Sequence, residues 1–408
     1  MKQLRTQVAI VGAGPAGLLL SHLLHRQGVE SVVLERRTRE YVERRVRAGL
    51  LEHTTVELLR QCGLADRLDR EGMRHGGFEL RVAGHRNRLD IAALTGHSTY
   101  VYGQQELVKD MIRAREEADG QLRFSVADVA LDLAEDEGPS TVRCSMDGRP
   151  TEITCDFVAG CDGFHGISRQ CLPPALLTAH ERRYPSAWLG ILAATPPTSG
   201  ELVYAVHERG FALASMRTPE ISRLYLQVGP GESLSDWPDE RIWKELHARL
   251  AVDGETSLTE GRVLERSLVA LRSYVAEPMQ HGPLFLAGDA AHIVPPTAAK
   301  GLNLAVEDVH VLNEAFRSWY ATGDRAALDG YSATRLPAVW EAEEFSDWMA
   351  DLLHRPPDDD PYAARLQQAR LDAVVNSHTV ARQLAERYVG LSRQTSGREG
   401  GAWSWNQA

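Results

Sequence analysis

Three glycines near the start of the chain constrain its fold more than any other feature. Gly12, Gly14 and Gly17 follow the spacing Gly-x-Gly-x-x-Gly. They come directly after residues 7–11, a mostly apolar run that is typical of a parallel strand covered on both faces. Residues 15–26 then carry leucines at helical spacing, which predicts a helix. The order strand, glycine turn, helix indicates an α/β domain.

Each glycine has a physical reason for its position. Gly12 permits a tight turn, Gly14 lets the backbone approach a pyrophosphate, and Gly17 lets the helix pack closely on the strand. The helix N-terminus also offers unpaired N–H groups and a positive dipole end to phosphate oxygens. Glu35 ends the next expected strand, residues 31–35, where its carboxylate can accept hydrogen bonds from ribose hydroxyls. The sequence therefore predicts a dinucleotide site.

The overall composition limits the partners and the compartment. The chain has 408 residues with 45 Lys and Arg against 56 Asp and Glu, and its net charge of −11 argues against a nucleic-acid partner. Its five cysteines form no Cys-x-x-Cys pair, and no His-Glu-x-x-His cluster is present, so we expect neither a metal site nor disulfides. The apolar stretch 8–20 is too short to span a bilayer. We therefore expect a cytoplasmic protein with no membrane partner.

Two further segments indicate which dinucleotide is bound. Residues 160–163, Gly-Cys-Asp-Gly, follow an apolar strand, and Arg169 comes six positions later. Far downstream, residues 284–292 place Asp289 at a strand end just before a small-residue turn. Together with the glycine turn, these segments resemble the second and third nucleotide-binding segments of FAD-dependent hydroxylases, in which an aspartate like Asp289 holds ribityl or ribose hydroxyls. The resemblance implies FAD as a permanently bound cofactor.

The resemblance extends over residues 6–391. This part of the chain resembles the 4-hydroxybenzoate 3-monooxygenases, a family of single-component flavoprotein aromatic hydroxylases. The segments that carry the resemblance are TQVAIVGAGPAGLLL, RVRAGLLE, AGCDGFHGISRQ, PMQHGPLFLAGDAAHIVPPTAAKGLNLA and ERYVGL. It implies that the chain hydroxylates 4-hydroxybenzoate at the ring 3-position to 3,4-dihydroxybenzoate, using NADPH and O2 through a C4a-hydroperoxyflavin. It also implies a homodimer.

The expected fold class is α/β, with three parts. A Rossmann-like FAD-binding domain comprises residues 1–75, 98–183 and 268–315. An antiparallel β-sheet domain that binds the substrate comprises residues 76–97 and 184–267, with strands expected at 187–193, 202–206, 211–216 and 223–228. A helical C-terminal region, 316–391, is expected to form the dimer interface, and the polar tail 392–408 is expected to be disordered.

A clamp for a carboxylate is expected in the antiparallel sheet. Ser215 and Arg217 are two positions apart on one strand, so they share a face. Arginine suits a planar carboxylate because it can donate two parallel hydrogen bonds to it. In the family that the chain resembles, residues matching Ser215, Arg217 and Tyr225 bind the carboxylate of the aromatic acid.

Two hairpins are expected to bring this clamp together. A two-residue turn at residues 208–209, between the strands expected at 202–206 and 211–216, would place Tyr204 opposite Leu213. A loop over residues 218–222 would place Ser215 opposite Tyr225 on the same face. The three clamp residues and Tyr204 should then meet.

The other end of the ring needs a path for a proton. A phenolate ring is richer in electrons than a phenol, and two tyrosines in series can pass the phenol proton outward without leaving a buried charge. The resemblance implies Tyr204 and Tyr388 as this relay and His75 as its outlet to solvent. It also implies that the backbone carbonyl of Pro296 contacts the substrate hydroxyl.

Further residues are expected to hold the two nucleotides. Asn303 opens a helix whose N-terminal dipole would point at the flavin, and Lys300 would reinforce the same field. Residues 36–47 carry six arginines against two glutamates, a local charge of +4 in an acidic protein. The resemblance also assigns FAD contacts to Arg47 and Gln104. It assigns NADPH contacts to Arg36, Tyr41, Arg45, His165 and Arg272.

Two departures from the family leave alternatives open. Ala298 stands where the family usually has glycine, and its methyl group faces the expected flavin–substrate interface. A sister hydroxylase acting on an amino- or ring-substituted 4-hydroxybenzoate is therefore the first alternative. Arg37 replaces the commoner glutamine, so NADH stays possible beside NADPH. A flavin halogenase, suggested faintly by Trp403 and Trp405 in the tail, and a flavin-binding sensor without turnover are weaker alternatives.

Overall fold

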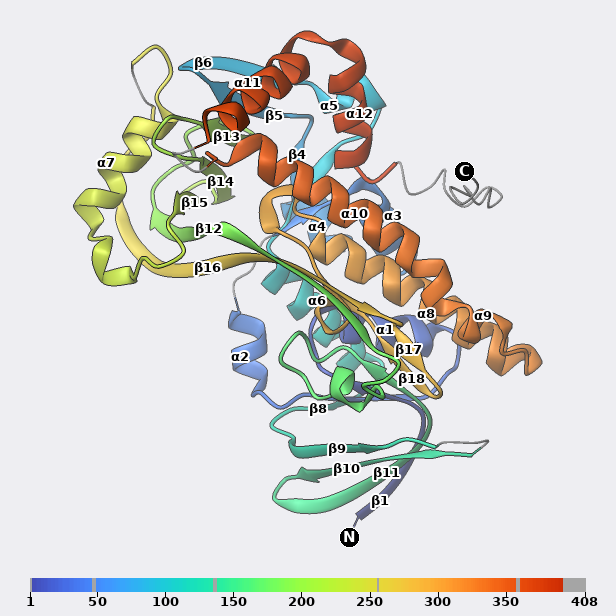
Figure 1. Cartoon of the computed structure of the whole chain (residues 1–408). Helices are drawn as coiled ribbons and strands as arrows, with labels where there is room; N and C mark the ends of the chain where they lie inside the picture. Colours follow the sequence, from blue (N-terminus) through green and yellow to red (C-terminus); the bar gives the residue numbers. More distant parts are fainter. Residues whose placement is uncertain (1, 46–48, 135–137, 255–256, 357–359, 392–408) are drawn as a thin grey trace, which may run out of the picture.

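The computed structural model describes residues 2–45, 49–134, 138–254, 257–356 and 360–391. Within these ranges it contains two large β-sheets, one small sheet and a group of C-terminal helices (Figure 1). This architecture confirms the predicted α/β fold class with an additional antiparallel sheet. The predictions for Arg47 and for the tail 392–408 lie outside the described residues.

The strands fall into three sheets. The first large sheet consists of β1 (Lys2–Val11), β2 (Ser31–Leu34), β8 (Gln121–Arg123), β9 (Ala127–Asp132), β10 (Ser140–Met146), β11 (Arg149–Gly160), β17 (Gln280–His281) and β18 (Leu284–Leu286). The second consists of β5 (Phe78–Val82), β6 (His85–Leu89), β12 (Thr178–Ala194), β13 (Leu202–Val206), β14 (Ala212–Thr218), β15 (Ile221–Val228), β16 (Arg262–Glu277) and β19 (His292–Ile293). The small sheet consists of β3 (Leu50–Leu51), β4 (Met73–His75) and β7 (Thr99–Val101).

Helices and short 3-10 turns connect these strands. The helices are α1 (Pro15–Arg26), α2 (Arg39–Arg44), α3 (His53–Gln61), α4 (Asp66–Glu71), α5 (Ile91–Thr95), α6 (Gln104–Glu117), α7 (Asp239–Leu250), α8 (Gly301–Thr322), α9 (Ala326–Asp329), α10 (Tyr331–Leu353), α11 (Pro361–Asn376) and α12 (His378–Tyr388). The 3-10 turns are η1 (Ser168–Cys171), η2 (Leu234–Asp236), η3 (Gly288–Ala290) and η4 (Pro296–Ala298).

The first sheet brings the three nucleotide-binding segments together. Its order is β17-β18-β11-β1-β2-β8, and β18, β11, β1, β2 and β8 run parallel. Val11 pairs with Gly160, and Gly160 pairs with Leu286, so β1, β11 and β18 end side by side. The glycine turn, the Gly-Cys-Asp-Gly turn and η3 therefore leave the same edge of the sheet, where open α/β sheets bind their ligands.

Two elements of this part differ from the sequence expectation. β1 begins at Lys2 rather than at residue 7, because its polar first half pairs with β11 starting from Thr151. The helical pattern between residues 49 and 68 forms two helices, α3 and α4. Gly63 separates them because it adopts a φ of +76°, which ends α3.

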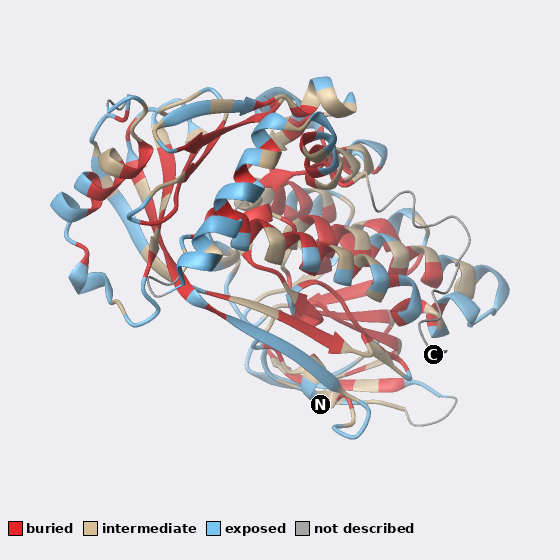
Figure 2. Cartoon of the chain, turned by 45° about the horizontal axis from the view of Figure 1, so that its top comes forward, coloured by how far each residue is buried: buried red, intermediate tan, exposed pale blue. Residues whose placement is uncertain are grey.

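The second sheet is covered on both faces. Its order is β19-β16-β12-β15-β14-β13-β5-β6, antiparallel except where β13 pairs with β5. One face packs through Leu224 and Leu226 against α7, and the other packs through Tyr204 and Phe211 against the C-terminal helices. Figure 2 shows the buried residues concentrated between these layers.

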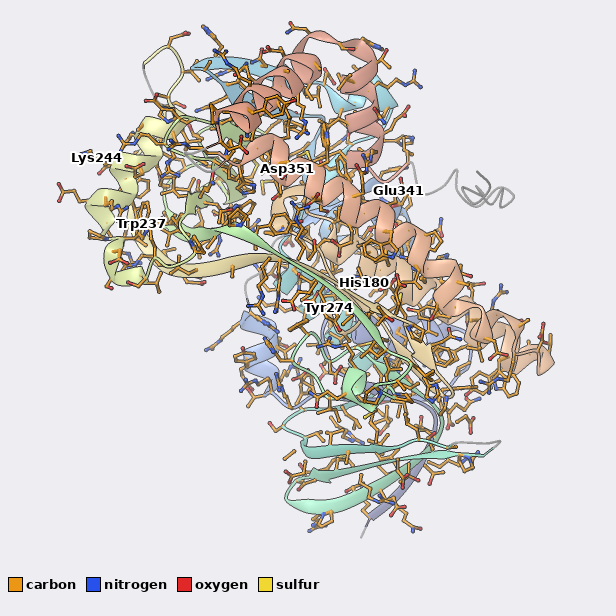
Figure 3. All side chains as sticks on the ribbon, viewed as in Figure 1. His180, Trp237, Lys244, Tyr274, Glu341 and Asp351 are labelled. Atoms are coloured by element: carbon orange, nitrogen blue, oxygen red, sulfur yellow. The ribbon has the colours of Figure 1, made fainter. Side chains whose placement is uncertain are left out.

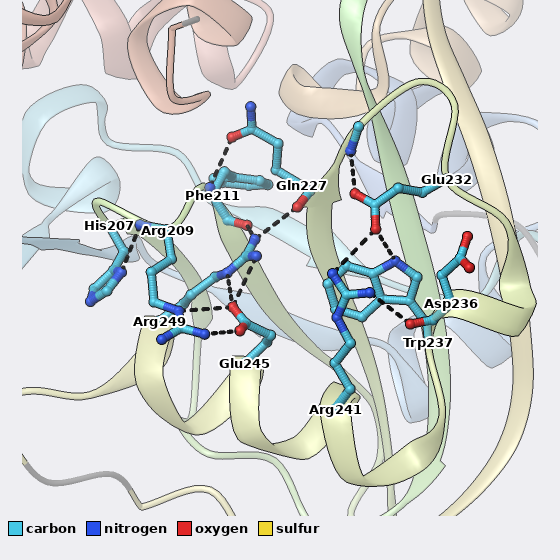
Figure 4. Close-up of polar contacts among 11 residues, drawn as sticks. His207, Arg209, Phe211, Gln227, Glu232, Asp236, Trp237, Arg241, Glu245 and Arg249 are labelled. Atoms are coloured by element: carbon cyan, nitrogen blue, oxygen red, sulfur yellow. Dashed lines mark hydrogen bonds and ion pairs between the residues drawn. The ribbon is translucent and has the colours of Figure 1, made fainter. Parts of the chain in front are cut away.

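Charged residues attach α7 to the edge of the hairpin formed by β14 and β15 (Figure 4). Arg249 on α7 donates to the carbonyls of Phe211 at 3.2 Å and Gln227 at 2.8 Å. Glu245 accepts hydrogen bonds from Arg249 and Arg209. The buried cation and the buried carboxylate are thus both paired, which buried charges require.

The register of the second hairpin corrects one expectation. Tyr204 pairs with Leu213, as predicted. Ser215, however, pairs with Arg223, and Tyr225 pairs with Leu213, so the predicted pairing of Ser215 with Tyr225 is wrong by two positions. The cause is a tight turn in which residue 218 pairs with residue 221, with Arg217 as the extra residue of a β-bulge. A shift of two preserves the face, so Tyr204, Ser215 and Tyr225 still share one side.

The long strands β12 and β16 extend from the second sheet alongside the first (Figure 1). Figure 3 labels His180 on β12 and Tyr274 on β16 in this extension. β12 is much longer than the predicted strand 187–193, because residues 178–183 continue the pairing with β16 beyond a bulge. None of the helices in the described ranges is long and apolar enough to cross a membrane. Among the same residues, no group of His, Cys, Asp or Glu could hold a metal ion.

Candidate active site

The glycine turn at the edge of the first sheet is shaped for a phosphate ligand. Gly12 has a φ of +107°, and a Cβ there would lie 2.3 Å from the Cys161 carbonyl oxygen, so no larger residue fits. A Cβ on Gly17 would lie 2.0 Å from the Gly12 carbonyl oxygen, as the predicted close packing requires. A Cβ on Gly14 would meet no atom within 4 Å, so this residue borders open space.

The end of α1 and the end of β2 supply two complementary groups to that space. Gly14 is the N-cap of α1 and makes no side-chain cap bond, so the first N–H groups of the helix are available to a ligand. Glu35 accepts hydrogen bonds from the backbone N–H of Ala13 at 2.9 Å and of Arg37 at 2.8 Å. These bonds hold the carboxylate of Glu35 against the glycine turn, as a ribose-binding acid needs.

The second and third segments are joined by an arginine. Arg169 donates to the carbonyls of Phe164 at 2.7 Å and Ala290 at 3.0 Å, and it lies over the rings of Phe164 and Tyr274. Asp162 accepts two hydrogen bonds from Ser168, from its N–H and its hydroxyl. Arg169 thereby fixes the turn that carries Asp289, whose own side chain is exposed. An exposed carboxylate at a strand end is available to ribityl hydroxyls.

A buried ion pair lies behind the N-terminus of α8. Lys300 is 1% exposed, and its Nζ donates to Glu52 Oε1 at 2.6 Å and to the carbonyls of Arg387 at 2.5 Å and Tyr388 at 3.2 Å. Asn303 accepts from the Glu52 N–H at 3.0 Å and donates to the carbonyl of Ala299 at 3.0 Å. Lys300 is thus a buried, paired side chain and not a solvent-exposed lysine of a loop. Its charge is balanced by Glu52, which sequence reasoning did not single out although it ends the segment RVRAGLLE.

The two tyrosines of the predicted relay lie in contact. Tyr204 and Tyr388 are each 1% exposed, and their hydroxyl oxygens are 3.1 Å apart. Tyr204 also donates to the carbonyl of Thr297 at 3.1 Å, so Tyr388 is the donor in the pair. Burial raises the pKa of both phenols, and their contact raises the pKa of Tyr388 further. The rings pack around Phe78, whose centroid is 5.1 Å from each.

The clamp residues lie on the face of the second sheet that contains Tyr204. Ser215 is 9% exposed, and Arg217 is partly exposed at the bulge. Burial of the guanidinium lowers the pKa of Arg217, which the hydroxyl of Tyr225 partly offsets, and the neighbouring Arg223 lowers it further. Two adjacent guanidinium groups in a desolvated setting favour an anionic ligand.

His75 is placed differently from the expectation. It was predicted as the outlet to solvent, but it is 1% exposed, and desolvation lowers its pKa. Its Nε2 lies 3.1 Å from the sulfur of Met216, and its Nδ1 is buried without a hydrogen-bond partner among the described residues. No hydrogen bond joins His75 to Tyr204 or Tyr388 within the described part of the chain. A direct histidine–tyrosine step is thus absent from this conformation, and the outlet role stays a prediction.

The residues predicted to contact NADPH form two groups. Arg272 lies 3.7 Å from the ring centroid of Phe164, and the ring of the exposed His165 lies 5.1 Å from the same centroid. Tyr41 is 47% exposed and lies under the guanidinium of Arg37. The second group is completed by two exposed arginines, Arg36 and Arg45. Exposed cations and aromatic rings suit a transiently bound anionic cosubstrate.

The remaining predicted residues lie at the starts of α6 and η4. Gln104 is the first residue of α6, and Pro296 opens η4 directly before Thr297, the carbonyl of which accepts from Tyr204. Ala298 is 1% exposed, so its methyl group fills buried space rather than facing solvent. Ala299 follows with a φ of +53°, a conformation uncommon outside glycine.

One aromatic neighbour was not predicted from the sequence. Trp188 lies 4.9 Å from Tyr225 and 5.4 Å from Phe211 by ring centroids, and its Nε1 donates to His354 Nε2 at 2.6 Å. The Trp188 side chain therefore supports the clamp from β12. Its position in a strand, four residues after Tyr184, gave no sign of this contact.

Comparison with known proteins agrees with this geometry. A family model described as "FAD binding domain" matches residues 5–346. The p-hydroxybenzoate hydroxylase of Acinetobacter baylyi is 44% identical over 392 residues, which cover 96% of both chains. The chain belongs to the FAD-dependent aromatic hydroxylases. This hydroxylase is therefore a flavoprotein monooxygenase with FAD as its cofactor.

More distant relatives share the fold. The 3-amino-4-hydroxybenzoate 2-monooxygenase of Streptomyces cremeus is 26% identical over 363 residues, which cover 86% of this hydroxylase and 88% of the relative. The crystal structure of p-nitrophenol 4-monooxygenase from Pseudomonas putida DLL-E4 superposes with a TM-score of 0.80 at 21% identity, covering 96% and 99% of the two chains. At that identity the likeness concerns the fold alone.

The residues of the hydroxylase fit FAD. The open space at Gly14, the uncapped N-terminus of α1 and the anchored Glu35 form a cradle for a pyrophosphate and a ribose. The N-terminus of α8 lacks a side-chain cap, so its N–H groups are available to an electron-rich ring edge. Gly14, Glu35, Asp289 and Asn303 would hold the cofactor, which supplies the redox chemistry that activates O2.

Proposed function

We propose that this hydroxylase converts 4-hydroxybenzoate to 3,4-dihydroxybenzoate, using NADPH and O2. The observation that supports the proposal is that Tyr204, Ser215 and Tyr225 share one face of the second sheet. The guanidinium of Arg217 lies in a desolvated setting near Tyr225, and the buried pair Tyr204 and Tyr388 lies on the same face of the sheet. A ligand with a carboxylate at one end and a phenol at the other satisfies both. The 44% identical relative, named p-hydroxybenzoate hydroxylase, supports this choice.

At the carboxylate end, the protein orients the ring. Arg217 donates hydrogen bonds to the carboxylate, and the hydroxyls of Ser215 and Tyr225 complete its shell. Burial strengthens each of these bonds because water competes less for the donors. The ring is thereby held in one orientation, so that only the position next to the phenol presents itself for oxygen transfer.

At the phenol end, the protein removes a proton. The Tyr204 hydroxyl turns from the Thr297 carbonyl to Tyr388, accepts the phenol proton and passes its own proton to Tyr388. Tyr388 releases its hydroxyl proton in the same step, so neither tyrosine carries a net charge after the transfer. The raised pKa of both tyrosines makes a persistent tyrosinate unfavourable, and the proton must therefore pass onward. We propose His75 as the next acceptor, reached after rearrangement or through water.

The proposal extends to the cosubstrate, the assembly and the compartment. Arg36, Arg45 and Arg272 bind the phosphates of NADPH, with Tyr41 and His165 beside them. Pro296 contacts the substrate hydroxyl through its carbonyl, and Arg47 and Gln104 contact FAD. The enzyme works as a homodimer in the cytoplasm. We also propose the three-part domain division given under Sequence analysis.

A second candidate substrate is an amino-substituted 4-hydroxybenzoate. The 26% identical relative is named 3-amino-4-hydroxybenzoate 2-monooxygenase, and Ala298 adds a buried methyl group at η4. The much higher identity to p-hydroxybenzoate hydroxylase favours the unsubstituted acid.

Anaerobic flavin reduction separates these possibilities. The holoenzyme is mixed with NADPH alone, with 4-hydroxybenzoate, or with 3-amino-4-hydroxybenzoate, and the loss of flavin absorbance is followed. We expect 4-hydroxybenzoate to accelerate reduction most. Equal rates with and without 4-hydroxybenzoate would refute the proposal. A larger acceleration by 3-amino-4-hydroxybenzoate would make that compound the favoured substrate.

A further inference from the structure

Asp308, a fully buried carboxylate on α8, is outside the residues so far given a role in binding. It is 0% exposed. Its Oδ2 accepts from the backbone N–H of Gly288 at 2.9 Å and lies 2.6 Å from His292 Nε2. Its Oδ1 accepts from Arg335 Nε at 2.9 Å. A single side chain on α8 thus contacts both ends of one short turn.

That turn carries an FAD-binding residue. Gly288 begins η3 with a φ of +62°, His292 begins β19, and the exposed Asp289 lies between them. A Cβ on Gly288 would lie 3.2 Å from the Cβ of Ala305 on α8 and 3.5 Å from the Cβ of Ala16 on α1. The turn therefore lies between the two helices whose N-termini face the FAD region.

Other contacts restrain the same turn from outside. Arg169 Nη1 donates to the Ala290 carbonyl at 3.0 Å, and Tyr331 donates to the Leu286 carbonyl at 2.9 Å. Asp308 differs from these because it alone among them holds the two ends of the turn together. Its charge is opposed by Arg335 and His292, and these cations keep the pKa of Asp308 at about 2, although burial works against them.

We propose that Asp308 is a positioning residue for FAD. It fixes the Gly288–His292 turn to α8, so that Asp289 and the N-terminus of α8 meet the cofactor in one preformed arrangement. A preformed site binds more tightly because the cofactor does not have to order the turn. The inference concerns cofactor binding, and it does not depend on which aromatic acid is the substrate.

Asparagine is a sharp test because it has nearly the same shape as aspartate but lacks the negative charge and one of the two oxygen acceptors. Asp308→Asn leaves one oxygen acceptor for three donors, and its NH2 group would face either Arg335 or the pair Gly288 N–H and His292. His292→Gln removes only one link to the turn. As a matched control, Glu245→Gln weakens a buried carboxylate on α7, a helix that packs on the second sheet, where Arg209 and Arg249 are its partners (Figure 4).

The measurement is release of FAD from diluted holoenzyme, followed by the rise in flavin fluorescence, together with thermal unfolding at two FAD concentrations. We expect the dissociation constant to rise at least tenfold in Asp308→Asn, on the order of the loss of hydrogen bonds to a charged group. We expect about threefold in His292→Gln and less than twofold in Glu245→Gln. The FAD-dependent part of the melting temperature should shrink in the same order.

Two results would overturn the proposal. One is a folded Asp308→Asn protein that melts earlier yet keeps its FAD affinity within twofold, because a purely structural carboxylate behaves that way. The other is equal weakening in the Glu245→Gln control. If Asp308→Asn does not fold, His292→Gln decides, and unchanged FAD affinity in that variant also overturns the proposal.

Discussion

Glu343, a buried carboxyl group on α10, makes the stability of this hydroxylase depend on pH in an unusual direction. It is 4% exposed, and both of its carboxyl oxygens are buried. Burial raises its pKa from 4.5 to about 7, an effect that Ser273, His292 and the backbone of Tyr274 oppose and Asp347 reinforces. The group is therefore neutral in the folded protein at pH values where it ionises readily in the unfolded chain.

The sign and size of the effect follow from linkage. A folded pKa above the unfolded value means that the folded state holds its proton longer, so stability declines as pH rises from below 4.5 through about 7. Each tenfold difference in proton affinity is worth about 1.4 kcal/mol, which gives a loss of about 3 kcal/mol at high pH. Between pH 5 and pH 8 the expected loss is about 2.5 kcal/mol.

Glu343→Gln tests this directly because the amide cannot ionise. Urea unfolding of the holoenzyme at pH 5, 6, 7 and 8 gives the free energy of unfolding for both proteins. The difference, variant minus wild type, should grow by about 2.5 kcal/mol from pH 5 to pH 8. Glu341→Gln, two positions earlier on the same helix, is the control for the removal of a carboxylate from α10. A difference that is constant with pH, or that shrinks as pH rises, would refute the reasoning.

Three further predictions concern the candidate site. Arg217→Ala should weaken binding of 4-hydroxybenzoate by on the order of 100-fold in a spectral titration, since a desolvated charge-assisted pair is lost; the FAD content should stay the same, and unchanged affinity would remove Arg217 from the clamp. Tyr388→Phe should slow hydroxylation and divert reduced flavin to hydrogen peroxide, measured as product per NADPH consumed; full coupling would exclude Tyr388 from the relay. Glu52→Ala should lower the free energy of unfolding, measured with urea, by about 3–5 kcal/mol, because it leaves the buried Lys300 charge without its carboxylate. Adding Lys300→Met should recover part of that loss. A double variant as unstable as the single one would contradict this.

Local chemistry made the nucleotide-binding edge predictable. Gly12, Gly14 and Gly17 each meet a steric demand within a few residues, and Glu35 follows at the end of the next strand. The same applies to the strand pairing of Tyr204 with Leu213, which a short turn sets. Such features depend on residues that are close in sequence, so the residue pattern predicts them.

Long-range features were harder to predict. The tight turn and the bulge at Arg217 together shifted the hairpin register by two, and neither leaves a distinct mark in the residue pattern. The pairing of Lys300 with Glu52 joins positions 248 residues apart, and the burial of His75 depends on the packing of Met216. These contacts exist only once the two sheets and the C-terminal helices are assembled.

The central claim is that this FAD-dependent hydroxylase places one oxygen atom next to the phenol of 4-hydroxybenzoate. The most direct measurement is product formation in air with labelled O2, with NADPH consumption followed in parallel. We expect one 3,4-dihydroxybenzoate per NADPH, carrying one atom of label in the new hydroxyl. NADPH consumption that yields only hydrogen peroxide, or a hydroxyl introduced elsewhere on the ring, would contradict it.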